Sequence, residues 1–138
     1  MTARLRRLLL VPAALLAALA APAALAQMLP SGTWTGTLAA AGGTPQAVEA
    51  EIERCETGFS VDLSVAGRAA RTETATWERG RLQFRLPALR LPDARAPRTL
   101  ACALDQQDDG ALSGVCRAGR TAYRLRLAPP ADAAFGCD

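Results

Sequence analysis

The sequence is constrained most by a two-residue alternation of apolar and polar side chains that recurs along most of its length after residue 31. In the segment 59–65, apolar residues hold the odd positions and Ser or Asp hold the even ones. Since successive side chains of a β-strand point to opposite faces, this period predicts strands that bury one face and expose the other. The other segments with this pattern are 33–38, 48–53, 81–86, 100–104, 112–116 and 122–127.

Turn-forming residues separate these segments, so the number of strands can be counted from the sequence. A Thr-rich stretch from Arg71 to Trp77 supplies an eighth strand, and no helical periodicity is found outside the first 26 residues. Eight short strands predict an all-β fold, an eight-stranded antiparallel up-and-down meander. Curling this meander into a closed or nearly closed small barrel buries one face and removes the exposed edges. The turn signals are Gly42-Gly43, Thr57-Gly58, Gly67, Arg79-Gly80, Asp109-Gly110 and Gly119.

The segment 87–98, PALRLPDARAPR, interrupts the alternation with Pro87, Pro92 and Pro97. Proline has no backbone N–H to donate to a strand ladder, so this segment is expected to be a long loop or an edge excursion. Long loops in small domains are enriched for function, although a plain surface crossover explains the same composition.

The first 26 residues resemble a targeting segment rather than part of the fold. Three arginines precede an apolar stretch from Leu8 to Ala20, and Ala24 and Ala26 form a small-x-small cleavage signal before Gln27. The pattern predicts a secretory signal peptide at 1–26 and a single domain at 27–138.

A membrane anchor is the rival interpretation, because Leu8 to Ala26 is almost wholly apolar. Pro12, Pro22 and the cleavage signal favour export instead. We therefore expect a periplasmic or extracellular bacterial protein without stable membrane insertion after cleavage. The chain carries 16 Lys+Arg and 13 Asp+Glu, and loss of the three signal arginines leaves 13 of each. A neutral chain without arginines interleaved with aromatics argues against nucleic acid as the partner.

Four cysteines in an exported chain indicate two disulfides. Cys102 and Cys116 lie at equal distances from Asp109, where a hairpin turn is expected, so they should face each other across it. Cys55 is then left for Cys137, which would tie down the C-terminal tail. No cysteines are spaced C-x-x-C, which argues against a zinc knuckle or a thioredoxin-type site.

The residues that the chain lacks narrow its chemistry. It contains no His, Lys or Asn, so it has no Ser-His, Cys-His or Ser-Lys nucleophile pair and no imidazole for a metal. The three glutamates of 49–53 share one strand face and fit a solvated outer surface. The three aspartates of 105–109 precede Gly110 and fit a hairpin turn better than a calcium loop. We expect no enzyme, no cofactor and no metal site.

Short motifs resemble a known superfamily. Gly32-Thr33-Trp34 matches a G-x-W element on a first strand, and Arg124 and Arg126 lie on the last one. This layout is similar to the calycin superfamily, and most closely to small lipocalin-like domains of exported bacterial proteins. The resemblance implies that Trp34 closes one end of the barrel and that a last-strand arginine packs across it. Neither a T-D-Y motif nor a C-terminal helix accompanies these motifs. The further matching segments are 36–38, 80–87 and 109–114.

The predicted barrel interior is aliphatic, so any ligand inside it should be neutral and apolar. Polar contacts could come only from Tyr123 and from a row formed by Thr72, Thr74 and Thr76. A filled interior is the competing expectation, because an eight-stranded barrel is at the size where side chains can fill it. The candidate ligand-binding residues are Trp34, Leu63, Thr74, Trp77, Phe84, Tyr123 and Leu125.

A second functional class remains open for an exported barrel of this size. A secreted protease-inhibitor-like or envelope interaction domain would use the N-terminal arm 27–30 or the proline loop 87–98. A cavity lined by Leu63, Phe84 and Leu125 would favour ligand binding. A filled interior with an ordered arm would favour the interaction class.

Overall fold

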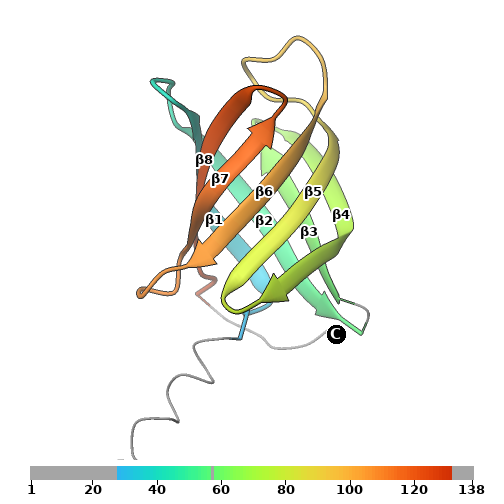
Figure 1. Ribbon diagram of the computed structural model, residues 1–138, viewed down its shortest axis with the longest axis vertical. Coiled ribbons are helices and arrows are strands. Elements are labelled where there is room, and N and C mark those ends of the chain that lie inside the picture. Colours follow the sequence, from blue (N-terminus) through green and yellow to red (C-terminus); the bar gives the residue numbers. More distant parts are fainter. Residues whose placement is uncertain (1–27, 57, 132–138) are drawn as a thin grey trace, which may run out of the picture.

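The computed structural model, which describes residues 28–56 and 58–131, is an all-β barrel (Figure 1). Each strand pairs antiparallel with its neighbour in sequence, and β8 pairs with β1 to close the barrel. The eight-stranded up-and-down barrel expected from the alternation is therefore confirmed. The strands are β1 Gly32–Ala40, β2 Gln46–Cys55, β3 Gly58–Val65, β4 Arg68–Glu78, β5 Arg81–Leu89, β6 Arg98–Gln106, β7 Leu112–Ala118 and β8 Thr121–Ala128.

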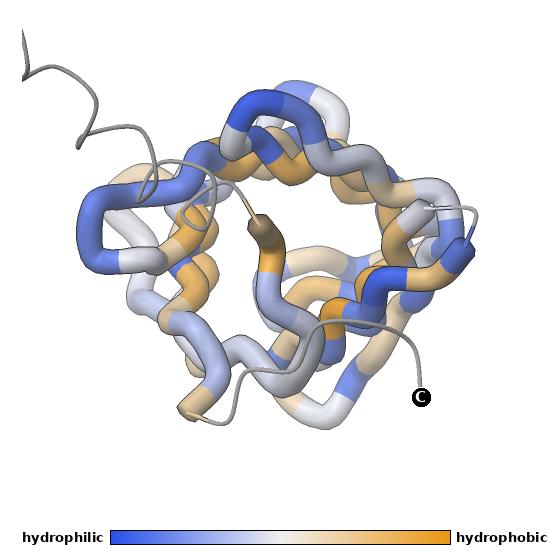
Figure 2. The backbone as a smooth tube through the Cα atoms, turned by 90° about the horizontal axis from the view of Figure 1, so that it is seen from below, coloured by the Kyte–Doolittle hydropathy of each residue, from blue (hydrophilic) through white to orange (hydrophobic). Residues whose placement is uncertain are grey.

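The apolar residues of the alternating segments line the inside of the barrel. In β5, Leu82, Phe84 and Leu86 are buried, and the residues between them are exposed. Figure 2, turned by 90° from Figure 1, shows the strands as a ring along which hydrophobic and hydrophilic residues alternate. No helix long and apolar enough to cross a membrane is found in the described part of the chain.

The barrel has two ends, which we call the base and the mouth. The base carries the start of β1, the β4–β5 turn and the β6–β7 turn 107–111. The mouth carries the β1–β2 turn 41–45, the β3–β4 turn, the β7–β8 turn and the loop 90–97, at the top of Figure 1. This loop is shorter than the 87–98 expected from the prolines. β5 continues through Pro87 to Leu89, and its register with β6 shifts between Leu86 and Leu89, where Ala88 has φ 53°. Pro87 lies within this irregularity, so its missing N–H costs no regular ladder bond.

A second irregularity lies in β4 and changes which side chains point inward. Phe59 of β3 pairs with Ala75, whereas Val61 pairs with Thr72, so β4 carries one extra residue there. Such a β-bulge reverses the inside–outside alternation beyond it. Thr72 and Ala75 are buried, but Thr74 and Thr76 are exposed. The expectation of one inward threonine row is therefore wrong beyond Thr72.

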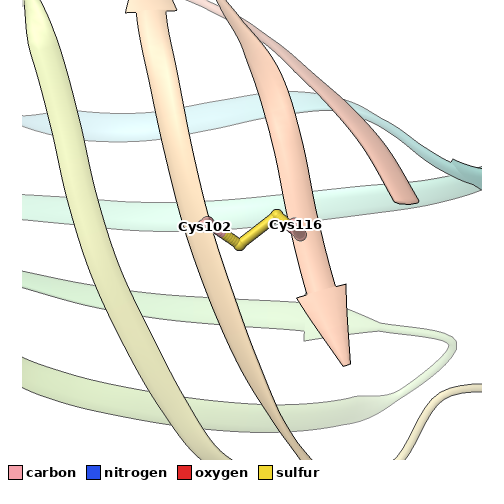
Figure 3. Close-up of a disulfide and its surroundings, with 2 residues drawn as sticks. All are labelled: Cys102 and Cys116. Atoms are coloured by element: carbon pink, nitrogen blue, oxygen red, sulfur yellow. A yellow bond between two sulfur atoms is a disulfide. The ribbon is translucent and has the colours of Figure 1, made fainter. Parts of the chain in front are cut away.

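The disulfide between Cys102 and Cys116 is present and confirms the hairpin pairing. These residues are direct partners on β6 and β7, with Cα atoms 4.0 Å apart, and both side chains are buried inside the barrel (Figure 3). Cys55 is exposed and has no disulfide partner among the described residues. Its proposed partner Cys137 and the proposed signal peptide 1–26 lie outside those residues, so both remain predictions.

Candidate functional site at the barrel mouth

The residues proposed to bind a ligand are spread along the barrel and do not surround one cavity. Trp34, Leu63 and Leu125 are fully buried in the core, and Phe84 and Tyr123 are 6% exposed. Trp77 is partly buried near the base, where it packs against the core. Thr74 is exposed next to the β4 bulge, with its hydroxyl 3.1 Å from the hydroxyl of the buried Thr72, and it lines none of the best-formed clefts in the described part of the chain.

Trp34 lies at the base, where it is completely buried. Its indole Nε1 donates a hydrogen bond to the carbonyl oxygen of Pro30 at 3.2 Å, and the neighbouring Leu29 is also buried. The indole thus has both an apolar environment and a partner for its polar atom, as a buried tryptophan requires. These contacts agree with a role for Trp34 in closing the barrel.

The last-strand arginines lie on the opposite face of the barrel wall from Trp34. Tyr123, Leu125 and Leu127 of β8 point inward, and the alternation directs Arg124 and Arg126 to the solvent. Arg126 pairs there with Asp109 at 2.7 Å. Neither arginine packs across Trp34, in contrast to the expectation from the resemblance.

Large aliphatic side chains occupy the barrel interior from the base to the mouth. The best-formed clefts on the described residues lie at the surface, and none of them is lined by Leu63, Phe84 or Leu125. The described structure therefore favours the filled interior. The largest fully buried side chains are Trp34, Ile52, Leu63, Leu82, Leu86, Leu89, Leu91, Leu100, Leu104, Leu112, Leu125 and Leu127.

A cleft of about 320 Å³ opens at the mouth, and we call it the mouth cleft. Its walls come from the end of β1, the β1–β2 turn, the start of β8 and the loop 90–97. Its volume is at the lower end of the range for small-molecule sites, about 300–1,000 Å³. Its lining includes Leu38, Thr44, Gln46, Leu91, Asp93 and Tyr123.

The loop 90–97 folds down over the mouth because Leu91 enters the core. Leu91 is only 2% exposed, and its carbonyl oxygen accepts a hydrogen bond from the N–H of Ala94 at 3.1 Å, which turns the chain back. Pro92 and Asp93 follow Leu91 and remain exposed along the cleft. The loop is thus both the cover of the barrel and one wall of the site.

Tyr123 joins the barrel wall to this loop. Its hydroxyl donates to the Asp93 carboxylate, with both carboxylate oxygens 3.4 Å away. Burial is the largest cause that raises the pKa of Tyr123 above its ordinary value of 10.0, and the Asp93 charge adds to it, against a smaller lowering by Arg98. The phenol therefore stays neutral over the physiological range.

The mouth cleft combines apolar walls with a few polar groups, which is the usual composition of a small-molecule site. Leu38 and Leu91 supply apolar surface. The Asp93 carboxylate accepts hydrogen bonds, and the Gln46 amide and the Thr44 hydroxyl can donate or accept. This set suits a mostly apolar molecule that carries a hydrogen-bond donor.

Of these residues, the sequence identified Tyr123 and the loop, but not Leu38, Gln46 or Asp93 as ligand contacts. Leu38 shows only the ordinary inward period of a strand. Asp93 meets Tyr123 across 30 residues of sequence, through a loop whose path depends on where Leu91 is buried. No signal in the local sequence reports that contact.

Asp109 stabilises the β6–β7 hairpin, whereas Asp105 of β6 pairs with the neighbouring strand β5. The Asp109 carboxylate accepts a hydrogen bond from the N–H of Ala111 at 3.0 Å, and this bond is the largest cause of its lowered pKa, with a further contribution from Arg126. Asp105 pairs with Arg81 at 2.8 Å. Within the described ranges, no group of three His, Cys, Asp or Glu side chains could hold a metal ion.

No protein-family model matches this sequence, and no curated protein matches it either.

Proposed function

We propose that this chain is an exported, non-catalytic binding module that holds a small, neutral, mostly apolar molecule in the mouth cleft. The observation that carries the proposal is the cleft itself, in which Leu38 and Leu91 flank the Tyr123–Asp93 pair. The filled interior supports a site at the mouth rather than inside the barrel, where the sequence analysis expected it. The lack of His and Lys supports a non-catalytic role.

An exported location is supported by the buried disulfide, which is consistent with an oxidising compartment. The signal-like segment 1–26 supports it independently. The likeness to lipocalin-like domains through Gly32-Thr33-Trp34 stays a prediction and agrees with a binding role.

Native mass spectrometry of the protein exported from a bacterial host tests the proposal first. We expect a reproducible mass increment from a co-purified small neutral molecule, which denaturation releases. A population that is reproducibly free of any such molecule would contradict the proposed carrier function.

The place of binding is tested with a neutral fluorescent probe, 1-aminoanthracene, which combines an apolar ring system with an amine donor. Thr44→Trp should obstruct the cleft from the exposed β1–β2 turn and weaken probe binding at least tenfold. Thr35→Trp is the matched control, because Thr35 is also exposed but lies on the outer face of β1, away from the cleft. Equal binding by the two variants would refute the mouth site.

An envelope interaction domain is the second candidate, and the filled interior favours it. The inhibitor-like version has no support from the described part of the arm. Leu29 is buried in the protein's own base and Pro30 accepts the Trp34 hydrogen bond, so these residues are not free to enter a protease.

A further inference from the structure

The fold segregates charges that are mixed in the sequence. On the outer face of β2, Glu49, Glu51 and Glu53 are all exposed, and Asp62 of β3 pairs with Glu51 in the ladder. The opposite part of the wall, β5–β8, carries outward arginines on three of its four strands. The outer face of β2 is thus rich in carboxylates, and the outer face of β5–β8 is rich in arginines.

In the described part of the chain, the arginines of β5–β8 have ion-pair partners near the base but not near the mouth. Near the base, Arg81 pairs with Asp105 at 2.8 Å and Arg126 with Asp109 at 2.7 Å. Nearer the mouth, Arg85, Arg117 and Arg124 are exposed, and none of them has an ion-pair or hydrogen-bond partner among the described residues. Within this wall, the positive charge is therefore uncompensated only in the half nearer the mouth.

Arg85, Arg117 and Arg124 lie close together, and we call their surface the basic face. Ala101 of β6 pairs with Arg85 on one side and with Arg117 on the other, which places the Cα atoms of those two arginines about 10 Å apart, two strand spacings. Arg124 pairs with Val115, two residues before Arg117 on β7. The outward residues between the arginines are small and uncharged: Ala101, Ala103, Val115 and Ala122.

The positive charge continues from the basic face onto the mouth. Arg98 and Arg120 are exposed at that end, with the Arg98 guanidinium beside Gly119 of the β7–β8 turn. Arg90 and Arg95 add to it from the loop 90–97, where Asp93 is the one carboxylate. The basic face thus borders a positively charged mouth end.

We propose that the basic face docks the protein on an anionic phospholipid surface. Guanidinium groups bind phosphate oxygens in a two-pronged geometry, and three arginines on neighbouring strands present several such groups to one lipid surface. The outward residues of β5–β8 include no aromatic side chain, so the face lacks the stacking platform of a single-stranded nucleic-acid site. Docking here would also hold the mouth end near the lipid, without inserting the barrel.

Co-sedimentation of the full exported protein with vesicles tests this proposal. The protein should bind vesicles of phosphatidylglycerol mixed with phosphatidylcholine and bind pure phosphatidylcholine far more weakly. Each basic residue near an anionic surface strengthens binding roughly fivefold, so replacing Arg85, Arg117 and Arg124 together by Gln should weaken it on the order of 100-fold. Binding should also fall steeply at about 0.5 M salt, where screening is strong.

The matched control replaces Arg71, Arg79 and Arg81 by Gln, which removes the same charge from β4 and the base. It should bind anionic vesicles like the unmodified protein, and thermal unfolding followed by circular dichroism checks that both variants fold. Equal losses in the two triple variants would overturn the proposal. It would also fail if the basic face bound an oligonucleotide or a second copy's acidic β2 face while vesicles remained unbound.

Discussion

Tyr123 is the single tyrosine of the chain, and its hydroxyl lies between the barrel core and the loop over the mouth. Its burial and its contact with Asp93 both disfavour the phenolate. Because the native state holds the neutral phenol better than the unfolded chain does, the protein should lose stability as the pH rises above 10.0, the ordinary pKa. Below that pH this contribution is fully present.

Titration of the phenol by ultraviolet absorbance isolates this residue, since no other tyrosine contributes. We expect a midpoint above 10.0 in the native protein. Asp93→Asn should lower the midpoint but leave it above the ordinary value, because burial is the larger cause. A midpoint that does not move in Asp93→Asn would show that the loop does not rest on Tyr123 in solution.

The sequence predicts that Trp34 closes the barrel, and its burial at the base agrees with this role. Trp34→Ala should lower the free energy of unfolding by roughly 3–5 kcal/mol, since it removes a fully buried indole from the base. Chemical denaturation measures this loss, and Trp77→Ala serves as the comparison because Trp77 is only partly buried. A smaller loss for Trp34 than for Trp77 would show that Trp34 does not close the barrel.

At the scale of the element, the alternation predicted the strands but not the two irregularities that interrupt it. One extra residue in β4, between Thr72 and Ala75, reverses which side chains point inward. The sequence does not show this reversal, because polar residues lie on both faces of β4. In β8, by contrast, the alternation itself predicts the orientation of the arginines. Because Tyr123, Leu125 and Leu127 are apolar and point inward, the arginines between them must point outward. The expectation that one of these arginines packs across Trp34 came from the family resemblance and not from the alternation.

The β4 bulge leads to a test with neighbouring substitutions. Thr74→Arg should lower the free energy of unfolding by only about 1 kcal/mol, because Thr74 is exposed and the substitution removes one side-chain hydrogen bond, to Thr72. Ala75→Arg should prevent folding or destabilise the protein by several-fold more, since it places a charge in the core. If the two substitutions had the reverse effects, β4 would be in the register without the bulge.

The strands also approach one another closely at two inward glycines. A Cβ at Gly36 would lie 1.7 Å from the carbonyl oxygen of Arg126, and one at Gly114 would lie 2.0 Å from that of Ala103. Backbone atoms cannot yield as flexible side chains can. These two positions therefore have to be glycine for the neighbouring strands to approach as closely as they do.

At the scale of the whole molecule, the amount of empty space was the property that the sequence could not settle. An eight-stranded barrel lies at the boundary between a filled and a hollow interior, and the outcome depends on how side chains from opposite walls meet. Here the loop 90–97 adds Leu91 to the mouth end and the arm adds Leu29 to the base. The space left for a ligand is the cleft between the loop and β1.

The location of a bound neutral ligand is the most direct test of this account. Methyl chemical shifts measured by NMR during titration with 1-aminoanthracene would report it. We expect changes at Leu38 and Leu91, with the interior residues Leu63 and Leu104 unaffected. Shifts confined to Leu63 and Leu104, with Leu38 and Leu91 unchanged, would place the ligand inside the barrel and contradict the filled core and the mouth site together.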